Sequence, residues 1–174
     1  MKTPLLWISL LVIAAGMMVV NGQEGTPPGM PPMQTPQIPG ITTADQFPQA
    51  CVDCHLNYTE MNMDVRLSTI MKGMSEKVDP ELLKKLQPTA PEGVTLKGKH
   101  PELGPEAFNN IPASCRTCHS PNSKTAPPAK QMTHVIHLTG EENIFLGMFG
   151  GECTHCHKLD KTTGLWSIPS AAEK

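Results

Sequence analysis

The sequence predicts a mainly α-helical protein with extensive loops and little or no β structure. Several stretches place apolar residues at helical spacing, whereas the alternation of apolar and polar residues that is typical of half-buried strands is absent. Aromatic residues make up only 4% of the 174 residues. We therefore expect the core to need apolar surface from a source other than the side chains.

Two helices are predicted in the first half of the chain. The first spans residues 60–74 and weakens at Gly73; its apolar face carries Met63, Leu67, Ile70, Met71 and Met74. The second is a short helix over residues 80–86, which Pro88 closes.

A third helix is predicted from Pro128, which suits a first helical turn, to Gly140, which suits a helix end. Its two faces carry Met132, Val135 and Ile136 on one side and His134, His137 and Leu138 on the other. Next, Thr139 and Glu142 resemble a capping box that starts a short apolar helix through Phe149. Two glycines then end this fourth helix.

The pattern Cys-x-x-Cys-His occurs three times and uses all six cysteines. It is the attachment signature of c-type haem. Two thiols separated by two residues can bond the two vinyl groups of one haem, and the next imidazole reaches the iron from the same side. We therefore expect three covalent haem c groups. The attaching residues are Cys51, Cys54, Cys115, Cys118, Cys153 and Cys156, and the iron ligands from the motifs are His55, His119 and His157.

Two other readings of the cysteine pairs are less consistent with the sequence. A structural zinc site closes with four ligands, and three cysteine pairs divide badly into fours. A zinc site also leaves the histidine after each pair unexplained. A thioredoxin-like dithiol needs a βαβ unit, which the sequence does not predict.

The remaining histidines are candidates for the second axial position of each iron. His134 and His137 lie one helical turn apart on the same face, so they cannot bind opposite sides of one iron. We expect them to serve two different haems and to hold those haems close together. His100, in a loop with Gly98 and Pro101, is the natural third ligand, and the alternative is an exposed loop histidine.

Two alternatives concern the other candidate ligands. His155 lies inside the third motif, which directs it away from its own iron, so we expect a surface residue or a ligand to a neighbouring haem. Methionine is the rival axial ligand. Met71 or Met74 could bind the first haem, in which case His100 would be spare.

The N-terminal residues 1–22 are typical of a signal peptide. Lys2 precedes an apolar run over residues 4–20, and compact residues up to Gly22 suit cleavage. We therefore expect export to the periplasm, where cytochromes of this type are assembled. The alternative is retention of residues 4–20 as a membrane anchor.

Two further regions follow the signal segment. Residues 23–49 are rich in proline and glycine, and predict a disordered tether. Residues 50–174 predict a trihaem domain whose polypeptide wraps three porphyrins, so the protein without haem should be largely unfolded.

The charge balance excludes nucleic acid as an expected partner. The net charge is −2, and it becomes −3 if residues 1–22 are removed, because Lys2 is the one charged residue there. Haem propionates add negative charge. We therefore expect an acidic surface that favours redox partners with basic docking patches.

The three motifs together with residues 134–137 resemble small multihaem c-type cytochromes of the periplasm. The sequence His134-Val135-Ile136-His137 looks like the His-x-x-His element of class III cytochromes. The resemblance implies that His134 and His137 bind two separate haems, as the helical spacing also requires.

Two functions from different classes follow. The first is an electron carrier, not an enzyme, in which every iron has two protein ligands and electrons pass between a donor and an acceptor protein. It could act free or as a subunit of a membrane complex. A filament would need a distal ligand such as His155 or His100 to cross between subunits. The second function is a multihaem reductase, which requires one iron with an open site.

Overall fold

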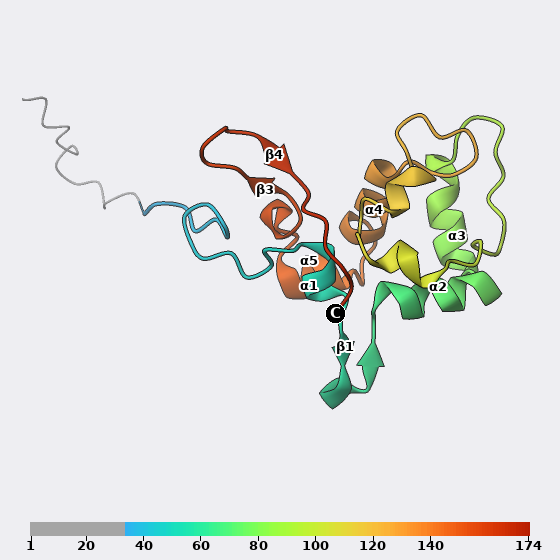
Figure 1. Ribbon diagram of the computed structural model, residues 1–174, viewed down its shortest axis with the longest axis horizontal. Helices are drawn as coiled ribbons and strands as arrows, with labels where there is room; N and C mark the ends of the chain where they lie inside the picture. The colour runs from blue at the N-terminus through green and yellow to red at the C-terminus, as the bar shows by residue number, and fades with distance from the viewer. Residues whose placement is uncertain (1–33) are drawn as a thin grey trace, which may run out of the picture. The chain divides into compact units, whose positions relative to one another are not determined.

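Short helices joined by long loops make up the computed structural model, which describes residues 34–174 (Figure 1). The α-helices are α1 (Cys51–Cys54), α2 (Leu67–Glu76), α3 (Pro80–Leu86), α4 (Ala129–Leu138) and α5 (Ile144–Phe149). The strands are β1 (Asn57–Tyr58), β2 (Met63–Asp64), β3 (Lys158–Leu159) and β4 (Trp166–Ser167). Short 3-10 helices cover Thr59–Met61, Gln87–Thr89, Pro105–Phe108, Cys115–Thr117 and Cys153–His155. The mainly α-helical class with extensive loops is therefore confirmed.

The β structure consists of two small antiparallel hairpins, β1 with β2 and β3 with β4. The first hairpin corrects the prediction of a helix from residue 60, because α2 begins at Leu67. Asn62 has a φ of 48° and turns the chain so that Met63 pairs with Tyr58. A left-handed residue of this kind interrupts a helix, and the spacing of apolar residues does not reveal it.

The other three helices lie where the sequence predicts them. Helix α3 has the predicted bounds, and the carboxylate of Asp79 caps it by accepting two backbone N–H groups. Helix α4 begins after Pro128. Helix α5 is capped by Asn143 instead of Thr139, because the Asn143 Oδ1 accepts the N–H groups of its first turn. Helix α4 packs beside α3 and contacts α5 (Figure 1).

The apolar core of the described residues is very small. Its buried apolar side chains are Ala50, Val52, Leu86 and Ile111. Among the residues around it, large apolar side chains such as Met148 and Leu165 are mostly exposed. The described side chains therefore bury little apolar surface among themselves.

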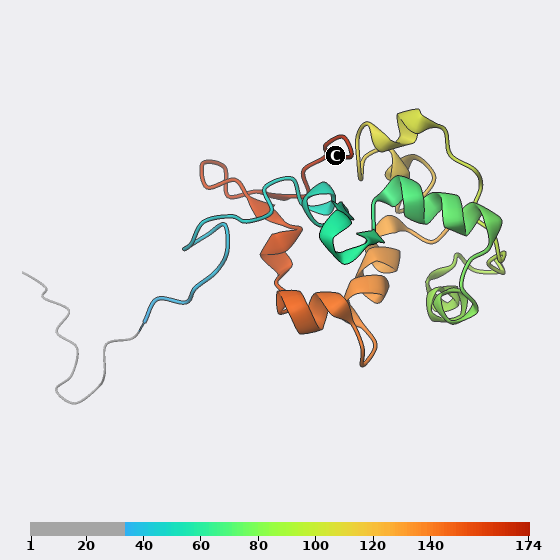
Figure 2. The ribbon, with the colours of Figure 1, turned by 90° about the horizontal axis from the view of Figure 1, so that it is seen from below.

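Residues 35–49 belong to the same compact unit as the rest of the described chain, which differs from the expected tether over residues 23–49. Lys158 Nζ forms an ion pair with Asp45 at 2.9 Å, and Lys161 Nζ donates to the Ile41 carbonyl at 2.9 Å. These bonds join the segment to the β3 and β4 region (Figure 2). The predicted signal segment 1–22 and residues 23–33 lie outside the described residues.

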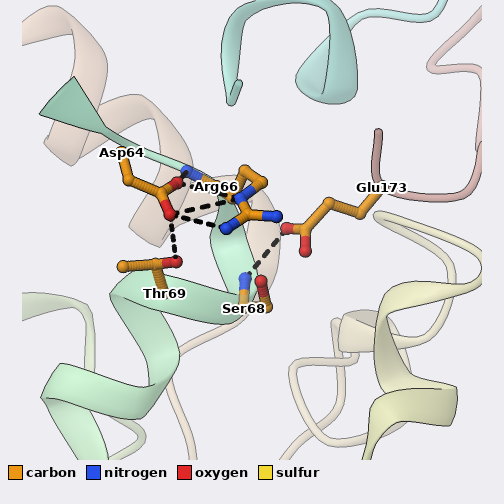
Figure 3. A network of polar contacts seen from close by, with 5 residues as sticks. All are labelled: Asp64, Arg66, Ser68, Thr69 and Glu173. Atoms are coloured by element: carbon orange, nitrogen blue, oxygen red, sulfur yellow. Dashed lines mark hydrogen bonds and ion pairs between the residues drawn. The ribbon is translucent and has the colours of Figure 1, made fainter. Parts of the chain in front are cut away.

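The C-terminal segment crosses back to earlier parts of the chain. Ala171 forms a backbone bridge with Ile111, and the Glu173 carboxylate accepts the N–H of Ser68 at 2.9 Å (Figure 3). Beside it, Arg66 pairs with Asp64 at 2.7 Å. These contacts tie the start of α2 to the chain end. Over residues 34–174, none of the helices has the length and apolar content needed to cross a bilayer.

Candidate haem sites

The three Cys-x-x-Cys-His motifs share one backbone geometry. In each motif the N–H of the histidine donates to the carbonyl of the first cysteine. These bonds measure 2.9 Å for His55, 3.0 Å for His119 and 2.8 Å for His157. The bond closes one helical turn, so the two cysteines and the imidazole of a motif project from a single turn of backbone. This is the local geometry that attachment of one haem requires.

Each motif histidine faces one histidine from elsewhere in the chain. The ring centroids of His55 and His137 are 6.2 Å apart, with 87° between the ring planes. Those of His119 and His100 are 6.0 Å apart at 15°. The third pair joins His157 and His134, 6.1 Å apart at 30°.

These pairs define three candidate sites, which are named here by chain order. The first site consists of Cys51, Cys54, His55 and His137; the second of Cys115, Cys118, His119 and His100; and the third of Cys153, Cys156, His157 and His134. All three motif histidines and all three predicted distal histidines fall into these pairs, and the cysteines belong to the sites through their motifs.

The ring separations match two imidazoles on opposite sides of one metal ion. A coordinating nitrogen lies about 2 Å from the metal, which places the centroids of opposite imidazoles about 6.3 Å apart. Two imidazoles on a tetrahedral zinc ion would be about 5.1 Å apart. The observed distances of 6.0 to 6.2 Å therefore favour opposite axial ligands.

Backbone carbonyls fix the tautomer of four of the paired imidazoles. A carbonyl only accepts hydrogen bonds, so each bonded Nδ1 carries the proton and leaves the Nε2 lone pair available for a metal. The bonds run from His55 to Val65 (2.8 Å), from His100 to Pro101 (2.7 Å), from His119 to Pro127 (2.7 Å) and from His137 to Thr133 (2.9 Å).

Helix α4 contacts all three sites. Its first residue, Ala129, donates its N–H to the carbonyl of His119 at 2.9 Å. Further along, His134 faces the third site and His137 faces the first. The two side chains thus face different motif histidines from one helix, as their spacing predicts.

The six cysteines are free thiols. Burial raises the pKa of Cys51 to about 11, and the neighbouring thiols of Cys156 and Cys115 add to this shift. Burial also raises the pKa of Cys54 and Cys156. A redox dithiol needs a lowered pKa, so these three thiols do not resemble one.

His155 is the one histidine outside the pairs, and the expectation of a surface residue is wrong. It is only 8% exposed. Its ring meets Phe47 at 4.7 Å, and Phe145 and Phe149 lie about it at 6.1 and 6.4 Å. Burial lowers its pKa, and its Nδ1 has no hydrogen-bond partner. The sequence signal for this packing is the spacing of the two phenylalanines on α5, four residues apart.

The residues fit haem as the group to be held. Within residues 34–174, no cluster of three or more His, Cys, Asp or Glu side chains could hold a metal ion. A porphyrin supplies four nitrogens of its own, so haem iron needs two protein ligands and no larger cluster. Burial lowers the pKa of His55 and His157, which favours the neutral imidazole that a metal binds.

Comparisons with protein-family models, curated proteins and solved structures found no match to this chain.

Proposed function

We propose that this protein is an electron carrier that holds three covalent haem c groups, each with two axial histidines. The observation that carries the proposal is the set of three imidazole pairs, in which each motif histidine faces a different distal histidine at 6.0 to 6.2 Å. Haem iron supplies a reversible one-electron couple when it is bound in this way.

The chain's own residues divide the work between attachment and ligation. When haem is bound, each cysteine thiol would add across one vinyl group, so that a carbon–sulfur bond forms, the thiol hydrogen moves to the other vinyl carbon and nothing is released. The paired histidines would ligate the iron, and in four of them Nδ1 donates to a backbone carbonyl and leaves Nε2 available. Because helix α4 carries ligands for the first and third sites, it keeps these two sites close to one another. Short separations are what electron tunnelling requires.

The alternative of a reductase needs an axial position without a protein ligand. Each motif histidine has an imidazole opposite it, so substrate binding would require a ligand to leave. A filament joined by shared ligands has no support in the pairs either, since all three form within one chain and His155 is buried. We propose redox proteins as donor and acceptor, with the protein exported to the periplasm.

Haem counting and carbon monoxide binding test this function. Full-length protein from a host that matures c-type cytochromes should gain the mass of three haems and give three haems per chain in the pyridine haemochrome assay. After reduction it should bind carbon monoxide slowly and in substoichiometric amounts. Unmodified thiols with bound zinc, or rapid binding of one carbon monoxide per chain, would contradict the proposal.

A further inference from the structure

Both imidazoles of the first site have fixed ring planes. The ring of Phe145 meets His137 edge to face, with centroids 5.7 Å apart and 87° between the planes. On the same imidazole, Nδ1 donates to the Thr133 carbonyl at 2.9 Å. Opposite it, His55 Nδ1 donates to the Val65 carbonyl at 2.8 Å. These contacts hold the two imidazole planes nearly perpendicular, at 87°.

The position of Phe145 is itself set by the junction between α4 and α5. The side chain of Asn143 accepts the Phe145 N–H at 3.0 Å. Its Nδ2 donates to the carbonyls of Ile136 at 2.9 Å and Thr139 at 3.0 Å, at the end of α4. One amide side chain thus joins the end of the helix that carries His137 to the start of the helix that carries Phe145. The hydrogen bonds of Asn143 therefore fix the backbone at Phe145 relative to the end of α4.

The second and third sites have a different arrangement. Their imidazole planes are closer to parallel, at 15° for His100 with His119 and 30° for His134 with His157. In the part of the chain that the structure describes, no phenylalanine, tyrosine or tryptophan ring lies against these four imidazoles. The aromatic contact distinguishes the first site from the other two.

The angle between axial imidazoles affects the energy of ferric iron. Low-spin ferric iron has one vacancy in the d orbitals that overlap the imidazole π systems. Parallel rings both raise the same d orbital, and the vacancy in it stabilises the ferric state. Perpendicular rings raise two different orbitals, so this stabilisation is lost and the reduction potential is higher. Nearly equal orbital energies also give a highly anisotropic electron paramagnetic resonance (EPR) signal.

We propose that Phe145 is a positioning residue that holds His137 perpendicular to His55 and thereby makes the first site the most readily reduced of the three. This inference rests on the proposed function. Transfer into the first site oxidises one iron of another site from ferrous to ferric and reduces the first-site iron from ferric to ferrous. One electron moves, and no bond or proton does.

The test is EPR of the full-length, matured protein during stepwise reduction. The oxidised wild type should show one highly anisotropic low-spin signal and two ordinary rhombic signals, and the anisotropic signal should disappear first. Phe145→Leu should convert it to a rhombic signal and lower the first site's equilibrium constant for accepting an electron at least threefold. Phe145→Tyr should retain the wild-type spectrum, because the tyrosine ring keeps the edge-to-face contact with His137.

Phe149→Leu is the matched control. Phe149 lies on the same helix and stacks on Phe145 at 6.3 Å, but its other ring contacts are with Phe47 and His155 and not with a paired imidazole. It should leave the EPR signals and the order of reduction unchanged. If Phe145→Leu fails to bind three haems, the inference is tested by the EPR spectrum of Phe145→Tyr and by the order in which the wild-type signals disappear.

Three results would overturn the inference: three rhombic signals in the wild type, reduction of a rhombic signal first, or the same change in both leucine variants. Failure of the proposed function has different signs, namely fewer than three haems per chain or a high-spin ferric signal. The two failures are therefore distinguishable in the same samples.

Discussion

His137 faces His55 across the first site, at 6.2 Å between ring centroids, although 82 positions separate them in the sequence. Three residues before it on the same helix, His134 faces His157 of the third site at 6.1 Å. One helix therefore carries histidines of two candidate sites. This relationship is the basis of the first prediction.

Single replacements on α4 should affect two different haems. His137→Met should change only the first site and His134→Met only the third, because each imidazole faces one motif histidine. In each variant one haem of three should gain thioether ligation and a higher reduction potential. EPR separates the two variants, since His137→Met should remove the highly anisotropic signal and His134→Met should retain it.

His155→Phe is the control for these two variants. It lies between Cys153 and Cys156 of the third motif, yet its ring packs on phenylalanines and faces no motif histidine. All three haems should keep two histidine ligands. Loss of the same haem signal in both methionine variants would contradict the assignment of ligands to sites.

Removal of His100 should open the second site. The ring of His100 is nearly parallel to that of His119, with 6.0 Å between the centroids. The backbone N–H of His100 donates to the Met74 carbonyl at 2.9 Å, which fixes the loop. His100→Ala should let the reduced protein bind one carbon monoxide per chain, as measured by optical titration. Met74→Leu keeps the backbone carbonyl and should bind no more than the wild type. Strong carbon monoxide binding by Met74→Leu would instead indicate that methionine is an iron ligand.

Sequence predicts the local parts of this protein better than the parts that depend on distant contacts. Pro80 and Pro128 mark the starts of α3 and α4, because proline suits the beginning of a helix. By contrast, the start of α2 depends on the left-handed turn at Asn62, which apolar spacing does not reveal. The same holds for residues 35–49, where one of the contacts joins Asp45 to Lys158, 113 positions later.

The candidate sites show the same division. The motifs, and the assignment of His134 and His137 to two different sites, follow from spacing alone. Spacing does not reveal which distal histidine faces which motif, because that pairing depends on how α4 lies against loops far away in the sequence. The burial of His155 depends likewise on Phe47, which lies in residues 23–49, the segment that the sequence predicts to be a disordered tether.

The protein without haem should be largely unfolded. Among the described residues, the buried apolar side chains are Ala50, Val52, Leu86 and Ile111, which is too little burial to offset the conformational entropy of ordering the loops. A variant with all six cysteines replaced by serine should show no cooperative transition when its far-ultraviolet circular dichroism signal is followed during heating. The matured wild type is the comparison. A cooperative transition in the cysteine-free variant would show that the polypeptide forms its own core.

Phe47→Ala should release residues 35–49 from the third motif. The edge-to-face contact with His155 at 4.7 Å and that with Phe149 at 5.8 Å are worth about 1 to 2 kcal/mol together. Amide hydrogen exchange at Thr42 and Thr43 should accelerate roughly 5- to 30-fold. The exposed neighbour Gln46 provides the control, because Gln46→Ala should leave exchange unchanged. Equal exchange in the Phe47→Ala variant and the wild type would show that the polar contacts of Lys158 and Lys161 hold the segment without the aromatic contacts.

Glu173 should act as a remote cap of helix α2. The side chain of Arg66, the residue before the helix, does not cap it, and the Glu173 carboxylate accepts the Ser68 N–H at 2.9 Å instead (Figure 3). Loss of a capping acceptor costs about 1 kcal/mol. Glu173→Ala should therefore accelerate exchange of the Ser68 amide roughly fivefold, whereas Glu173→Gln, which keeps a carbonyl oxygen, should do so less.

Ser68→Ala separates capping from any other role of this contact. Glu173 binds the backbone N–H of Ser68 and not its hydroxyl, so this variant keeps the bond and should leave exchange in α2 close to that of the wild type. Acceleration in Ser68→Ala equal to that in Glu173→Ala would show that the serine side chain stabilises the helix start. Acceleration in Glu173→Ala alone would mean that the C-terminal segment, through one carboxylate, orders the helix whose end also fixes the His100 loop.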